Sequence, residues 1–153
     1  MKLAEALAAR SDLQTRLEQL RSRIAASARY QEGDAPPEDA AALLREAVAV
    51  TQQLETLIAA INRTNGSVRL DDGRTLSDAL AARDTLRLRH SVLSSAAEAA
   101  TGHGGQRQLR SELRQIAALD VPAVRAQADV VARELRELDA RIQQTNWTVD
   151  LAE

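Results

Sequence analysis

The chain has 153 residues, of which 44% are hydrophobic, and a formal net charge of −2. This length predicts a single domain over residues 1–153, and the mixture of both charge signs without a long basic run argues against nucleic-acid binding. The chain contains no cysteine, which excludes disulfides and thiolate metal sites. No apolar run approaches the ~18 residues of a membrane span and no signal-peptide core is present. We therefore expect a soluble, cytoplasmic protein.

The first predicted element is a helix over residues 3–28. Its apolar stripe steps by four and three residues, through Ala6, Arg10, Leu13, Leu17, Leu20, Ile24 and Ser27. Residues 32–37 contain glycine and two prolines, which predict a loop. A second helix is expected over residues 38–63, with a stripe at Leu44, Ala47, Thr51, Leu54, Ile58 and Ile61. The short connection favours an antiparallel helical hairpin.

The next segment is predicted to leave the helix. Thr64, Asn65 and Gly66 are typical of a helix end, and the alternating residues around Asp71-Asp72-Gly73 indicate a short β-hairpin. A third helix is expected over residues 76–100, ended by the glycine-rich segment 101–105. Residues 106–119 fit either a helix or an extended segment. A fourth helix is expected after Asp120, with a stripe at Val124, Ala128, Val131, Leu135, Leu138 and Ile142.

The sequence indicates an internal duplication, with one copy in residues 1–70 and the other in residues 74–151. LAEALAAR at residues 3–10 returns as LSDALAAR at 76–83, and INRTNGSVRL at 61–70 returns as IQQTNWTVDL at 142–151. Leu3 and Leu76 are 73 residues apart, whereas Ile61 and Ile142 are 81 apart, so the second copy carries a longer loop. We predict a mainly α protein of two antiparallel helical hairpins, four-helix bundle-like, with short β-hairpins at one end. The two terminal segments are expected to pair, within the chain or between subunits.

Six residues are candidates for ligand binding. Arg10 and Arg83 occupy equivalent positions on apolar stripes, where each guanidinium either packs structurally or clamps an anion. Asn62, Asn65 and Asn146 lie at the two related helix ends, where they either line a polar pocket or satisfy backbone groups. Trp147, the only tryptophan, either plugs the base of the bundle or anchors an interface. Only two histidines occur, His90 and His103, without metal-site spacing, so we expect no metal, no cofactor and no catalytic residues.

The motifs resemble the septicolysin-like family of uncharacterised bacterial proteins. The resemblance covers the whole chain and is carried by LAEALAAR near the start, INRTN at 61–65, LDDGRTLSDAL at 70–80, RLRHSVL at 87–93 and LDARIQQTNWTVDL at 138–151. It implies an extended strand at residues 110–114. The family name implies a cytolysin, although the mixed charges and alanine-rich faces of the helices do not favour membrane binding.

Three functional interpretations follow. The first is a non-catalytic, homo-oligomeric structural or interaction protein, whose partner is itself or another protein. The second is a small-molecule or anion-binding protein that uses the paired arginines and the Thr-Asn helix ends. The third is a membrane-active, cytolysin-like assembly.

Overall fold

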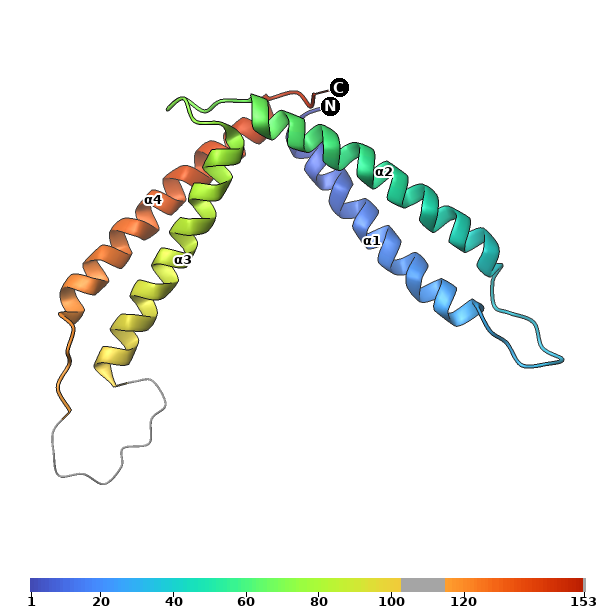
Figure 1. Cartoon of the computed structure of the whole chain (residues 1–153), viewed down its shortest axis with the longest axis horizontal. Helices are drawn as coiled ribbons and strands as arrows, with labels where there is room; N and C mark the ends of the chain where they lie inside the picture. The colour runs from blue at the N-terminus through green and yellow to red at the C-terminus, as the bar shows by residue number, and fades with distance from the viewer. Residues whose placement is uncertain (103–114, 153) are drawn as a thin grey trace. The chain divides into compact units, whose positions relative to one another are not determined.

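The structure, a computed structural model, describes residues 1–102 and 115–152, and it is mainly helical. Its four helices are α1 (Leu3–Ser27), α2 (Ala40–Ser67), α3 (Leu76–Thr101) and α4 (Val121–Thr148). Figure 1 shows α1 beside α2 and α3 beside α4, each pair antiparallel. Within the described ranges there is no β-sheet. The predicted pair of helical hairpins is therefore confirmed at the level of its helices.

The chain divides into two compact units. The first comprises Met1–Arg69 and Gln144–Glu153, and so holds the α1–α2 hairpin together with the last turn of α4. The second comprises Leu70–Gln143 and holds α3 with most of α4.

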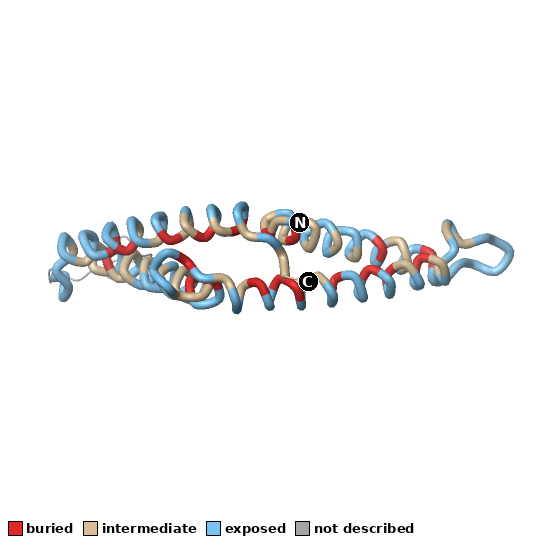
Figure 2. Tube along the Cα trace, turned by 90° about the horizontal axis from the view of Figure 1, so that it is seen from above, coloured by how far each residue is buried: buried red, intermediate tan, exposed pale blue. Residues whose placement is uncertain are grey.

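The core of the first hairpin is aliphatic. Its buried cluster consists of Leu20, Leu43, Ala47, Val50 and Leu54, and the partly buried Leu13, Leu17 and Ile24 pack against it. Figure 2 shows buried positions as a discontinuous red stripe along helices whose remaining positions are intermediate or exposed. Two ion pairs reinforce the hairpin: Arg16 pairs with Glu46 across α1 and α2, and Arg23 pairs with Glu38, which lies just before α2. Because only two helices share this core, much apolar surface of the hairpin faces solvent.

The predicted stripe of α2 is wrong by one position over part of its length. Leu44 and Ile58 were expected to face the core, yet they are 55% and 37% exposed, while Leu43 and Val50 are buried instead. The reason is that α2 is apolar on more than one stripe, so that periodicity alone does not select the face that meets α1. The stripe of α4 is confirmed at Ala128, Val131, Leu138 and Ile142, which are all buried.

Helix starts follow the expected capping chemistry. The Asp120 carboxylate accepts a hydrogen bond from Ala123 N (3.1 Å), which caps α4 as predicted. At α3, Thr75 and Asp78 form a reciprocal capping box, with Asp78 N donating to Thr75 Oγ1 (3.1 Å). At the other end of α3, Gly102 adopts a left-handed φ of 75°, so the helix ends there as expected.

Helix α2 does not end at the Thr-Asn-Gly segment. It continues through Thr64, Asn65 and Gly66 to Ser67, four residues beyond the predicted end at residue 63. The Thr64 hydroxyl donates to Ala60 O (2.9 Å), and Gly66 is not among the glycines with positive φ. Glycine permits a left-handed conformation but does not impose one, and here the helical hydrogen bonds continue. The prediction that Thr64 and Asn65 end the helix and start a turn is therefore wrong.

The predicted short β-hairpins do not form. Between α2 and α3 there is a tight turn, in which Gly73 N donates to Leu70 O (2.9 Å) and Leu70 N donates to Arg74 O (3.0 Å). The longer α2 leaves only residues 68–75 between the helices, where Arg69 and Thr75 are single bridge positions and no strand extends beyond them. Residues 115–119 are not helical. Residues 106–114, including the strand expected at 110–114, lie outside the described residues.

The terminal segments pair within the chain, as one of the two predicted options requires. Lys2 and Asp150 form an isolated antiparallel bridge. Leu3 N donates to Val149 O (3.0 Å), and Leu151 N donates to Met1 O (2.9 Å). The contact is a single bridge and not a pair of strands, because α1 begins at Leu3 and the helical residues that follow cannot extend a ladder.

Candidate interaction surface

A mostly apolar groove lies between α1 and α2, and we call it the first groove. It has a volume of about 400 Å³, and its apolar walls are formed by Leu17, Ile24 and Ala25 of α1 and by Leu44, Ala47 and Val48 of α2. Leu44 is 55% exposed and Val48 is 51% exposed. Branched aliphatic side chains on one helix face are more often buried than exposed. This groove is therefore a candidate contact surface.

The charges beside the first groove are paired within the chain. Arg21 lies 3.0 Å from Glu18 on α1, and both side chains are 68% exposed. On the same hairpin, Arg23 Nε donates to Glu38 (2.9 Å), and this hydrogen bond holds the pKa of Glu38 below its ordinary value. The same hydrogen bond raises the pKa of Arg23. The groove therefore presents an apolar surface with little net charge at its edge.

A second mostly apolar groove lies between α3 and α4, and we call it the second groove. It has a volume of about 450 Å³, and its walls include Leu93 of α3 and Ala126, Val130 and Val131 of α4. Val130 is 44% exposed. Arg89 and Glu134 also line this groove, and within the described residues neither has an ion-pair partner. The second groove thus combines apolar walls with one unpaired charge of each sign.

A further groove on the second unit is polar. It has a volume of about 320 Å³, and its lining includes His90 and Ser94 of α3 with Arg125, Ala128 and Asp129 of α4. No group of three His, Asp or Glu side chains suited to a metal ion occurs in the described part of the chain. His103 lies outside the described residues. The lining of this groove therefore carries charged side chains of both signs.

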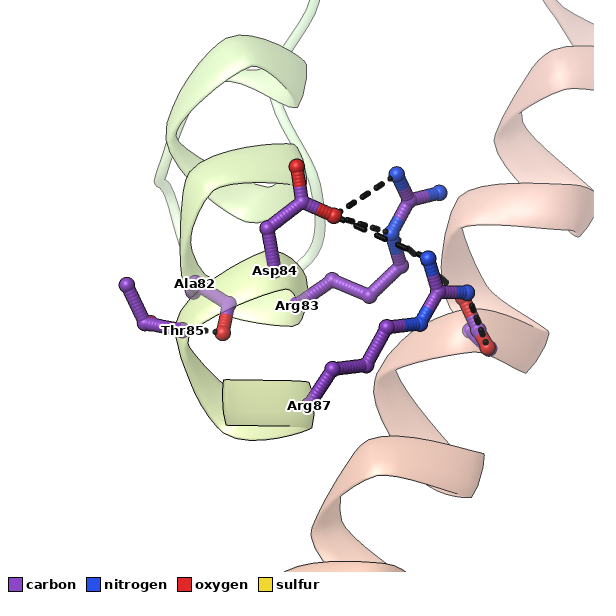
Figure 3. Close-up of polar contacts among 6 residues, drawn as sticks. Ala82, Arg83, Asp84, Thr85 and Arg87 are labelled. Carbon is purple, nitrogen blue, oxygen red and sulfur yellow. Dashed lines mark hydrogen bonds and ion pairs between the residues drawn. The ribbon is translucent and has the colours of Figure 1, made fainter. Parts of the chain in front are cut away.

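The two candidate arginines have different surroundings. Arg83 Nη2 lies 3.0 Å from Asp84 Oδ1, and Arg83 Nε lies 3.9 Å from Asp139 on α4. Arg87 also contacts Asp139 (3.3 Å), and Figure 3 shows Arg83 and Arg87 extending side by side from α3 with Asp84 next to both. These carboxylates neutralise Arg83 within the second unit. By contrast, the Nε of Arg10 in the first unit is buried without a hydrogen-bond partner among the described residues.

The other candidates lie in the last turns of α2 and α4. Asn62 is exposed and Asn65 is half-buried on α2, while Asn146 is buried on α4. The polar contact that sequence reasoning missed belongs to their neighbour Thr64, whose hydroxyl accepts a hydrogen bond from Ala152 N (2.9 Å). The signal in the sequence was the repeated Thr-Asn pair, at residues 64–65 and 145–146, but this repeat does not show whether the threonine or the asparagine makes the hydrogen bond. Trp147 is 63% exposed, so it does not plug a core.

An ion pair fixes the terminal bridge beside these residues. Lys2 Nζ lies 2.8 Å from the Asp150 carboxylate and also donates to Thr148 O (3.0 Å). The hydrogen bond from Lys2 holds the pKa of Asp150 below its ordinary value. This end of the first unit is thus occupied by contacts within the chain, and the apolar grooves are the larger open surfaces.

The fold and the grooves define a mainly α-helical protein of two antiparallel helical hairpins, each with an exposed apolar groove. The chain belongs to the family of unknown function DUF6847, whose sequence model matches residues 10–151. It is also similar to the crystal structure of a functionally unknown conserved protein from Corynebacterium diphtheriae. The identity is 38%, with 99% of this chain and 98% of that chain covered and a TM-score of 0.92. None of the curated proteins matches the chain.

These findings correct the resemblance that the motifs indicated. The septicolysin-like assignment is wrong, because both the family and the similar crystal structure are of unknown function and neither points to septicolysin. Within the described ranges, none of the helices has both the length and the apolar character that a membrane crossing requires.

Proposed function

We propose that this protein is a non-catalytic structural or interaction protein that assembles with itself through the apolar faces of its helical hairpins. The observation that carries the proposal is the pair of open apolar grooves, with Leu44, Val48 and Val130 each more than two fifths exposed. Apolar patches of this kind on a protein surface commonly mark contact sites. A helical hairpin covers such a patch when another helical pair packs on it, which yields a four-helix arrangement.

Light scattering coupled to size-exclusion chromatography tests the proposal directly. We expect the wild-type chain to elute as one oligomer from about 1 to 100 μM, and native mass spectrometry to give a whole-number multiple of the chain mass. A monomer at every concentration would overturn the proposal. Extra mass beyond the protein would instead point to a bound small molecule.

The internal duplication is part of this proposal, because it would supply two related contact surfaces in one chain. In its support, α1 and α3 begin 73 residues apart, at Leu3 and Leu76, and α2 and α4 end 81 apart, at Ser67 and Thr148. The hydrogen bond from Leu70 N to Arg74 O also corresponds to that from Leu151 N to Met1 O under the same offsets. In an experimental structure, α1–α2 should superpose on α3–α4 at these offsets. If the two hairpins superpose equally well when these offsets are shifted by one residue, the duplication is rejected.

Arg10 supports a second candidate function, the binding of a small anion. A buried guanidinium nitrogen without a partner is costly, and an anion would supply the missing acceptor. We expect phosphate or sulfate at millimolar concentration to raise the melting temperature of wild-type protein but not of R10M. Arg83→Met is the matched control, because Arg83 already contacts carboxylates in its own unit. Equal responses of the wild type and R10M would rule this function out.

A further inference from the structure

The equivalent faces of the two hairpins carry opposite chemistry. With the offsets of 73 for α1 to α3 and 81 for α2 to α4, the apolar Leu17, Leu44 and Val48 of the first groove correspond to His90, Arg125 and Asp129. Those three residues line the polar groove of the second unit. One position in the fold is thus apolar in the first hairpin and charged in the second. The charged lining of the polar groove is suited to contact with water. The apolar lining of the first groove, at the corresponding positions, is not.

The opposite face shows the reverse difference. In the second groove, Ala126 and Val130 correspond to Arg45 and Ala49 of the first hairpin, while Arg89 and Gln127 correspond to Arg16 and Glu46. Arg16 and Glu46 form an ion pair across α1 and α2. An ion pair therefore bridges the first hairpin at the position where the second hairpin has an open apolar groove. The apolar grooves of the two hairpins thus lie at positions that do not correspond to each other.

We propose that the first groove of one copy binds the second groove of another copy of this chain. This inference rests on the proposed self-assembly and adds which surfaces meet. A crossed contact of this kind covers both apolar grooves with a single type of interface. Pairing of the first groove with itself would leave Val130 and its neighbours exposed, and pairing of the second groove with itself would leave Leu44 and Val48 exposed.

The charges favour the crossed contact over pairing of first grooves. Arg21 and Glu18 lie beside the first groove in a weak, exposed pair at i,i+3 spacing. Arg89 and Glu134 line the second groove without ion-pair partners among the described residues. A crossed contact offers Glu134 to Arg21 and Arg89 to Glu18. Pairing of two first grooves would give Arg89 and Glu134 no partner.

The absence of cysteine makes the contact testable by disulfide cross-linking. Two differently tagged chains, one carrying Val48→Cys and the other Val130→Cys, are co-expressed, purified through both tags and oxidised. We expect a cross-linked heterodimer on a non-reducing gel. The matched control replaces Val48→Cys with Asp129→Cys, which puts the thiol at the corresponding position of the polar groove. That pair should give at least about tenfold less cross-linked product.

The outcomes separate this inference from the proposed function. A Val48→Cys to Val48→Cys product in place of the mixed product would overturn the crossed contact while self-assembly stands. Equal cross-linking by the Asp129→Cys control would also overturn it. A wild-type chain that is monomeric by light scattering would overturn both. As a second measure, Val48→Glu should weaken self-association at least about tenfold, whereas Asp129→Glu should leave it within about twofold; the reverse order would reject the inference.

Discussion

The core of the first hairpin gives the most direct test of the packing argument. Leu20 is fully buried between α1 and α2, within a cluster of only five buried residues. Replacing it with alanine removes about three methylene-sized groups and leaves a cavity. We expect Leu20→Ala to lower the free energy of unfolding by about 3 kcal/mol, within the range of 2–5 kcal/mol typical of buried leucines.

Leu88→Ala is the matched control, because Leu88 is a leucine of α3 that is 68% exposed and does not line either apolar groove. It should cost less than about 0.5 kcal/mol, as most surface substitutions do. Urea unfolding followed by circular dichroism at 222 nm, at a single protein concentration, measures both. If the two variants lose similar stability, or if Leu20→Ala loses less than about 1 kcal/mol, the assignment of the core is refuted.

Three further predictions concern polar contacts. Thr64→Val should cost about 1–2 kcal/mol in urea unfolding, because Thr64 is buried and accepts a backbone hydrogen bond; Thr56→Val should cost much less, since Thr56 is exposed and bonds only within its own helix. The pKa of Glu38 is lowered by its hydrogen bond from Arg23. The stability from this pair is therefore present above about pH 4.3 and is lost as the pH falls through the lower folded-state pKa. The urea midpoint of unfolding should therefore fall less between pH 6 and pH 3 in Glu38→Gln than in the wild type. An equal fall in both proteins would contradict this. Asp120→Ala should lower the free energy of unfolding by about 1 kcal/mol and speed amide exchange in the first turn of α4, because the helix loses its cap. Unchanged stability and unchanged exchange would show that the cap does not stabilise α4.

Features set by local chemistry could be predicted from the sequence. The start of α4 after Asp120 and the end of α3 at Gly102 depend on a capping carboxylate and a left-handed glycine, which act through neighbouring backbone groups. The stripe of α4 was predicted because its other faces are charged. In contrast, α2 has aliphatic residues on two adjacent stripes, and only contact with α1 decides that Leu43 and not Leu44 is buried.

The grooves could not be predicted, because they depend on which apolar residues the second helix of each hairpin leaves uncovered. Val48 and Val130 were not singled out by any motif, and their exposure appears only when the helices are paired. The candidate asparagines could be recognised by their repeated position at the ends of two helices, but the sequence does not determine their hydrogen-bond partners. A helix end of Thr-Asn-Gly is compatible with both a turn and another helical turn, and tertiary contacts such as the one from Ala152 to Thr64 select between them.

The bridge between the terminal segments has a consequence for how the chain can be ordered. Since Leu151 donates to Met1 and Leu3 donates to Val149, residues at opposite ends of the sequence are hydrogen-bonded neighbours. A short linker between the two ends, combined with an opening at the turn of residues 70–74, would exchange the order of the two hairpins along the chain while keeping their helices intact. Such a rearranged chain would be synthesised with α3 and α4 before α1 and α2, so the order of synthesis and the packing of each hairpin can be varied independently.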